Sequence, residues 1–275
     1  MAFPTNSTVL DDFNRANGSI GSSWTSDALG FGSDAAIIES NEIRSPGGGT
    51  DWSDGYYNVS SPGPDFEVYA HITTKPATDE VLGVLWLHPT GIGGSGVDGF
   101  SSYLKVEAGA DLLRLQRITN QTWVDLGATP VSQEFTAGWW LGLERIGTTL
   151  AGWYFNGSIW VQYTSATDGN HTGTGRLAFD MQGTTARINE IKGGTVVVAG
   201  GTIDQLTHQW REDDGSESGA SAIGSAGGNL VRPISSAVRA RIQLNVTGNP
   251  DAIVPLLEYR IKRASKADEW RKVRV

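Results

Sequence analysis

Carboxyl groups in a regular spacing would be the clearest sign of catalysis in this chain of 275 residues. Hydrolysis of a glycosidic bond needs two carboxyl groups on one face, about 5 Å apart in retaining enzymes, and an alternating Glu-x-Asp-x-Glu strand places them there. Residues 1–197 contain no such run, and the nearest match is Glu212, Asp214 and Glu217 beside Gly215. A solvated acidic turn accounts for that match. The sequence therefore predicts a protein that is not an enzyme, with glycoside hydrolysis as an alternative.

Histidine and aspartate side chains are the candidates for a metal site. The four histidines have no partner two or four positions away: His71, His88, His171 and His208. A zinc site of closely spaced ligands is therefore not predicted. Asp51 and Asp54 carry the oxygen ligands that Ca²⁺ prefers, although an ordinary polar loop has the same composition. The protein is expected to require no cofactor, and Ca²⁺ is the metal ion that this loop would bind.

Aromatic side chains with polar neighbours are the candidates for a carbohydrate site, because a ring offers a flat apolar surface with a polar edge. Four such candidates are Trp52, Tyr56, Tyr57 and Trp123. Trp86 lies within an apolar run and is predicted to be a core residue.

Short strands joined by tight turns must position these side chains. Residues 66–74 alternate as a half-buried strand does, and the apolar run 81–87 is typical of a central strand covered on both faces. Asn156-Gly157 predicts a type I′ hairpin between two apolar runs. Further strands are expected at 101–106, 112–118, 139–145, 149–155, 159–163, 175–181, 186–191, 237–246 and 256–262. No long amphipathic helix is indicated, so the chain is all-β.

Charge and composition divide the chain into two domains. Residues 1–194 form the larger predicted domain, 195–202 a Gly-rich linker, and 203–275 a smaller domain. Residues 1–197 carry 10 Lys and Arg against 21 Asp and Glu, whereas residues 198–275 carry 11 against 9. The net charge of -9 argues against a nucleic-acid partner. No export signal or apolar membrane span is recognised.

The order of elements in the larger domain resembles the concanavalin A-like lectin/glucanase jelly-roll family. The resemblance spans about residues 10–194 and depends on Trp139 to Gly147, the hairpin from Leu150 to Tyr163, Gly173 to Phe179, and Ala186 to Gly194. It implies a jelly-roll sandwich followed by a smaller β-sandwich, of immunoglobulin or fibronectin type, in residues 203–275.

A second resemblance concerns structural proteins of tailed bacteriophages. Asp12 to Gly18 with Trp24 looks like the start of jelly-roll modules in phage tail and other structural proteins. Trp210 to Glu217, Val238 to Leu244, Thr247 to Pro250, Leu257 to Arg260 and Trp270 to Val273 are together similar to a small β module of virion proteins. The resemblance implies a non-enzymatic virion protein, either a capsid decoration or tail-associated. It would assemble in the host cytoplasm and be displayed on the particle surface.

The smaller, basic domain would then dock to other virion proteins. Its docking residues would be Arg232, Arg239, Arg241, Arg260, Lys262, Arg263, Arg271 and Arg274. Virion symmetry implies a homo-oligomer, and host-surface glycans are the expected external partner. The alternative function is a carbohydrate-binding adhesin or receptor-binding module with the same fold.

Overall fold

The protein is described by a computed structural model that covers residues 3–26, 34–47, 52–92 and 96–196. Beyond these it covers 202–212, 222–223, 225–227, 238–247, 258–261 and 269–272. The chain divides into two compact units, Met1–Val197 and Val198–Val275. In unit 1 the described strands form two antiparallel sheets, so the predicted all-β class is confirmed.

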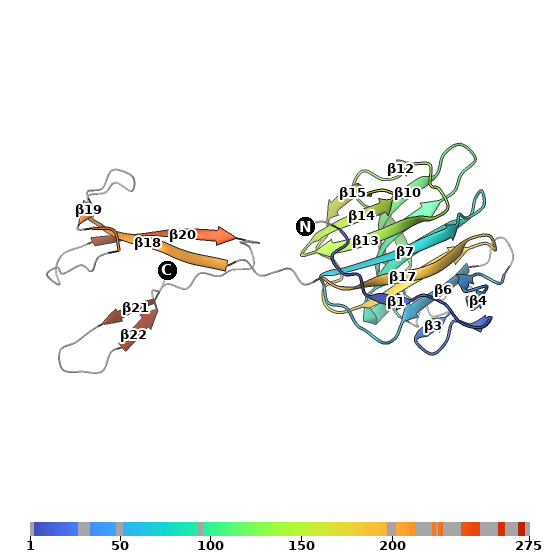
Figure 1. Ribbon diagram of the computed structural model, residues 1–275, viewed down its shortest axis with the longest axis horizontal. Helices are drawn as coiled ribbons and strands as arrows, with labels where there is room; N and C mark the ends of the chain where they lie inside the picture. The colour runs from blue at the N-terminus through green and yellow to red at the C-terminus, as the bar shows by residue number, and fades with distance from the viewer. Residues whose placement is uncertain are drawn as a thin grey trace. The chain divides into compact units, whose positions relative to one another are not determined.

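Sheet A has nine strands and faces the viewer in Figure 1. Its order is β15 (Trp160–Thr167), β14 (Thr149–Phe155), β13 (Trp139–Ile146), β7 (Phe66–Thr74), β17 (Arg187–Thr195), β5 (Glu42–Arg44), β4 (Ile37–Glu39) and β2 (Gly18–Ser19). Strand β1 (Val9–Asp11) also pairs with β17. The first and last strands of unit 1 are therefore neighbours in one sheet.

Sheet B has eight strands and packs behind sheet A. Its order is β11 (Thr122–Asp125), β10 (Leu112–Thr119), β9 (Gly99–Lys105), β8 (Val81–Leu87), β16 (Arg176–Gln182), β6 (Trp52–Tyr57) and β3 (Trp24–Ser26), with β12 (Val131–Ser132) paired to β10. A 3₁₀ turn, η1 (Pro89–Gly91), follows β8. Among the described residues, no helix is long and apolar enough to cross a membrane.

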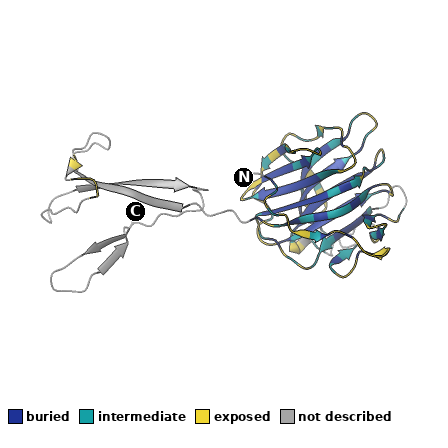
Figure 2. Cartoon of the chain, in the orientation of Figure 1, coloured by how far each residue is buried: buried dark blue, intermediate teal, exposed yellow. Residues whose placement is uncertain are grey.

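The core lies between the two sheets, where alternate residues of each strand meet (Figure 2). On β8, Leu82, Val84 and Trp86 point inward, and Trp86 stacks on Phe66 of β7 with ring centroids 5.2 Å apart. Trp86 is fully buried, as predicted. Because side chains alternate along a strand, Val81, Gly83 and the other odd-numbered residues of β8 point to the outer face of sheet B.

The strand predictions hold best where the apolar pattern is strong. Those at 66–74, 81–87 and 149–155 are confirmed at the same bounds. The hairpin after 149–155 is also confirmed, but its turn is not type I′, because that turn needs positive φ at both central residues. Only Gly157 has one, at 90°, while the Asn156 side chain accepts hydrogen bonds from the backbone N–H groups of Ser158 and Ile159.

The segment after residue 50 differs from its predicted polar loop. Residues 52–57 form β6, which lies between β16 and β3 inside sheet B. Small residues permit this placement: a side chain at Gly55 would lie within 2.9 Å of the Phe179 ring. The strand is hard to recognise in the sequence because two of its inward residues, Ser53 and Gly55, are small, and only the inward Tyr57 is large.

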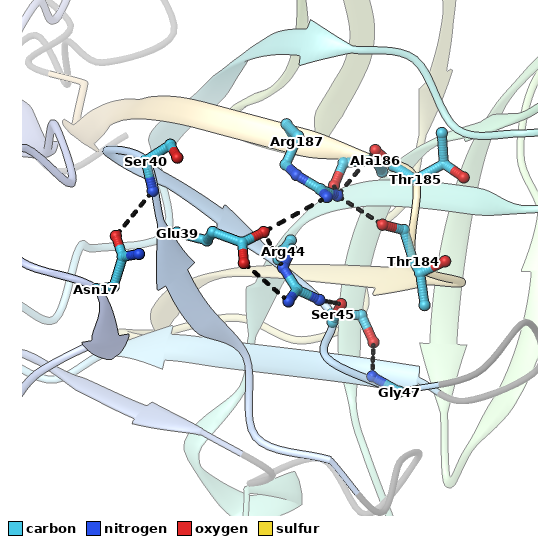
Figure 3. Close-up of polar contacts among 10 residues, drawn as sticks. All are labelled: Asn17, Glu39, Ser40, Arg44, Ser45, Gly47, Thr184, Thr185, Ala186 and Arg187. Atoms are coloured by element: carbon cyan, nitrogen blue, oxygen red, sulfur yellow. Dashed lines mark hydrogen bonds and ion pairs between the residues drawn. The ribbon is translucent and has the colours of Figure 1, made fainter.

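An ion cluster holds the β4–β5 hairpin against the start of β17 (Figure 3). Arg44 donates to the Glu39 carboxylate at 2.7 Å, and Arg187 lies 3.9 Å from the same carboxylate. The hydrogen bond and charge of Arg44 lower the pKa of Glu39. Arg187 also donates to three carbonyls just before β17, those of Thr184, Thr185 and Ala186. These partners indicate a structural cluster rather than a ligand site.

Residues 3–8 form a strap across the outer face of sheet A. The Phe3 ring stacks on Trp153 at 4.9 Å between centroids and meets the Trp160 ring edge-on at 4.7 Å. Gly142 lies beneath it, where a side chain would come within 2.7 Å of the Phe3 ring. The Glu67 carboxylate accepts the backbone N–H groups of Thr5 and Asn6.

The described strands of unit 2 form two small sheets. Strand β18 (Thr202–Glu212) pairs with β20 (Val238–Thr247) and β19 (Ala222–Ile223), and β21 (Glu258–Ile261) pairs with β22 (Glu269–Lys272). The sandwich of immunoglobulin or fibronectin type in residues 203–275 stays a prediction.

Candidate functional site

A groove of about 260 Å³ opens on the outer face of sheet B. Trp52 of β6 and Trp123 of β11 both line it, although their strands lie toward opposite edges of the sheet. Their rings lie on either side of Tyr103, at centroid distances of 6.3 and 5.5 Å. The groove is lined by Trp52, Val81, Tyr103, Lys105, Arg114, Gln116 and Trp123. Three aromatic rings from β6, β9 and β11 thus form one surface.

Tyr103 forms the floor of the groove, at 7% exposure. Its neighbour on β8 is Gly83, where a side chain would lie 2.7 Å from the Tyr103 ring and 2.4 Å from the Asp180 carboxyl. The missing side chain lets Tyr103 lean over β8 and donate its hydroxyl hydrogen to Asp180 of β16 at 3.0 Å. Burial raises the pKa of Tyr103 well above its usual value, so the hydroxyl stays a hydrogen-bond donor.

Asp180 and Asp54 form a buried carboxyl pair beside this floor. They are direct cross-strand partners on β16 and β6, and both are fully buried. Burial raises the pKa of Asp180 from 3.8 to about 7, and the nearby Asp54 adds to the rise. The sequence offers no sign of this pair because the two strands are far apart along the chain. Neither carboxyl lines the groove, so the pair supports its floor without reaching a bound ligand.

Two cations lie at the β9–β10 side of the groove. Arg114 is paired across the sheet with Tyr103, and its guanidinium donates to Asp125 at 2.7 Å. Asp125 also accepts a hydrogen bond from Gln116 at 2.8 Å. Lys105, which follows Tyr103 on the same face of β9, forms an ion pair with Glu107 at 2.8 Å.

The four aromatic residues predicted for a carbohydrate site do not all meet. The structure brings Trp52 and Trp123 to the groove, and sequence reasoning missed Tyr103 between them. Tyr56 is half-buried against an apolar cluster of sheet B, outside the groove lining. Tyr57 points the other way, toward Trp24, with ring centroids 5.3 Å apart. Alternation along β6 explains the position of Tyr57, because neighbouring residues face opposite sides of the sheet. Tyr56 shares the face of Trp52 but lies four residues further along the strand.

The predicted metal and docking residues fall largely outside the described part of the chain. Asp51 lies outside the described residues, and Asp54 is buried beside Asp180. Where side chains are described, no three His, Cys, Asp or Glu residues are grouped to hold a metal ion. The docking residues Arg232, Lys262, Arg263 and Arg274 also lie outside the described residues, and for Arg239, Arg241, Arg260 and Arg271 only the backbone is described.

Comparison of the sequence with protein-family models and with curated proteins finds no match. Solved structures do resemble the fold. The VIP36 exoplasmic/lumenal domain in its Ca²⁺/Man2-bound form has a TM-score of 0.50 at 12% identity, covering 70% of this chain and 89% of that domain. Its metal-free form has a TM-score of 0.50 at 12% identity, covering 72% and 95%. A legume lectin-like domain from Entamoeba histolytica has a TM-score of 0.47 at 13% identity, covering 64% and 91%. The likeness shows the fold alone: the chain contains a legume-lectin-like jelly-roll sandwich, as its sequence predicted.

Proposed function

We propose that the protein binds carbohydrate in the groove on the outer face of sheet B. The observation that carries this proposal is the aromatic surface of Trp52, Tyr103 and Trp123. Aromatic rings supply large, rigid apolar area, and the neighbouring polar side chains supply hydrogen bonds. A pyranose ring has both kinds of surface, since its C–H groups form apolar patches between hydroxyl groups.

The polar side chains of the groove suit a ligand rich in hydroxyl groups. Gln116 and Arg114 are held in place by the shared Asp125 carboxylate, so they are ordered before a ligand arrives. Such preorganisation lowers the entropy cost of binding. The proposal therefore favours the binding-module alternative over an enzyme, and the buried Asp54 and Asp180 are assigned a supporting role only.

Separate replacement of the two outer aromatic residues tests this proposal. Trp52→Ala and Trp123→Ala are each expected to weaken glycan binding about tenfold or more, since truncation of an aromatic residue that anchors a ligand costs about 1.4 kcal/mol or more. Binding is first located on a glycan array and then measured by calorimetry with the full chain.

Trp140→Ala is the matched control. Trp140 is also a half-buried tryptophan, but it lies on β13 in sheet A, beside His71 and Lys192. Its replacement is expected to leave glycan affinity unchanged. Equal affinities of wild type, Trp52→Ala and Trp123→Ala would contradict the proposal, as would an array without any bound glycan. Parallel measurements with Ca²⁺ and with a chelator test the Ca²⁺ prediction separately.

We propose separately that the protein is displayed on a phage virion and docks to it through the basic residues of 203–275. The support is the sequence resemblance and the charge difference between the two predicted domains. Deletion of residues 198–275 is expected to abolish attachment to particles. Attachment that survives the deletion would argue against the docking role and leave the groove proposal untouched.

A further inference from the structure

We infer that the ligand of the groove is an acidic saccharide, in which a carboxylate of the sugar pairs with Arg114 while the ring lies on the aromatic surface. This inference rests on the proposed function and names the ligand class of that same groove.

The first support is the charge of the lining. Among the described residues that line the groove, Lys105 and Arg114 are cationic and none carries a carboxylate. This is unusual for its surroundings, because residues 1–197 hold 10 Lys and Arg against 21 Asp and Glu. A groove for a neutral sugar has no need of two cations, whereas an anionic ligand gains from both.

The second support is the geometry of Arg114. Its guanidinium makes one hydrogen bond to the described chain, to Asp125. Guanidinium has five N–H donors arranged as a planar fork, and two of them can bind one carboxylate side by side. Asp125 therefore fixes the plane of the guanidinium and leaves further donors for a ligand. Partial exposure of Arg114, at 29% of its side chain, gives a ligand access to them.

Lys105 is a second cation that can bind the ligand carboxylate, with little loss of folding stability. Its ion pair with Glu107 is 2.8 Å long, and both side chains are over one third exposed. Exposed ion pairs of this kind contribute little net stability. Lys105 can therefore leave the Glu107 carboxylate and pair with a ligand carboxylate at a small difference in free energy. It would turn toward the groove when an acidic ligand binds.

The aromatic surface identifies the anion as part of a sugar. A free phosphate or an acidic peptide segment would use Arg114 and Lys105 but has no flat apolar face for Trp52 and Trp123. A uronic or sialic acid unit presents both a carboxylate and ring C–H groups within one residue. A sulfated sugar is the other source of an anionic group, and the experiment separates it from the carboxylated one.

The test uses an array that carries neutral, carboxylated and sulfated glycans, probed with the full chain. The bound glycans are expected to be carboxylated. The best of these is then compared by calorimetry with its methyl ester, which keeps the ring and removes the charge. The ester is expected to bind at least about tenfold more weakly, because it loses one charge-assisted hydrogen bond to Arg114.

Arg114→Gln is expected to lower affinity for the acid about tenfold and to make acid and ester bind alike. Arg44→Gln is the charge-matched control, since Arg44 also donates to one carboxylate at 2.7 Å but lies in sheet A. It is expected to preserve the preference for the acid.

Two outcomes separate this inference from the proposed function. Bound glycans that are only neutral or only sulfated, or equal affinity for acid and ester, would overturn the acidic-saccharide inference and leave carbohydrate binding standing. An array without any bound glycan would remove both.

Discussion

Replacing Asp180 with asparagine is expected to make the protein more stable than wild type at neutral and alkaline pH, with the difference vanishing in acid. Asp180 is fully buried, and burial raises its pKa from 3.8 to about 7. The folded protein therefore holds a proton on Asp180 at pH values where the unfolded chain has lost it. Stability contributed by this group is present below pH 3.8 and is lost as the pH rises toward 7.

The size of the effect follows from the shift. About three pKa units at ~1.36 kcal/mol each give an upper bound of about 4 kcal/mol between acid and pH 8. The amide introduced by Asp180→Asn would accept from Tyr103 as the carboxyl does and would donate its hydrogens toward Asp54, without any charge to bury. Glu67 and Glu144 also have raised pKa values from burial, so the comparison must be made between variant and wild type at each pH.

Urea unfolding followed across pH 4 to 8 measures this difference. Asp79→Asn is the control, because Asp79 is exposed and has φ of 68°, a conformation that asparagine also adopts. It is expected to follow the wild-type profile. A constant difference between Asp180→Asn and wild type over the whole pH range would show that Asp180 does not hold a proton in the folded state.

Phe3→Ala is expected to lower the free energy of unfolding by about 3 kcal/mol, at the lower end for Phe replacements in packed sites. Phe3 is only 5% exposed, although it belongs to a strap outside both sheets. Its ring fills the space between Tyr69, Trp153 and Trp160, and Gly142 leaves a hollow beneath it. Loss of the ring leaves this hollow empty and exposes the two tryptophans to water.

Urea unfolding and tryptophan fluorescence report the two effects together. Val9→Ala serves as the control in the same part of the chain, since Val9 is 48% exposed and is expected to change stability by about 0.5 kcal/mol or less. If Phe3→Ala changes stability no more than Val9→Ala does, the strap contributes nothing to the folded state.

The sequence predicts much of the framework of unit 1 because several of its strands carry a clear apolar pattern. Residues 66–74 place apolar residues at every second position, and residues 81–87 form a continuous apolar run. Strand β6 lacks such a pattern, because two of its inward residues, Ser53 and Gly55, give no hydrophobic signal. The elements that could be predicted are those whose burial depends on large side chains.

The groove could be predicted only in part. Trp52 and Trp123 are recognisable as aromatic residues among polar neighbours, but Tyr103 reads as one more strand residue within 101–106. Its role depends on Gly83 and Asp180, which register alone brings beside it. Pairing between distant strands decides which side chains share a face, and a single sequence does not encode that register in any local pattern.

The placement of β1 beside β17 has a consequence for avidity. The chain enters and leaves unit 1 through neighbouring strands of sheet A, whereas the groove opens on the outer face of sheet B. The two strands that begin and end unit 1 thus belong to the sheet that does not carry the groove. Many copies held on one support could engage a repeating polysaccharide at once, and a weak single contact would become a durable one through effective concentration.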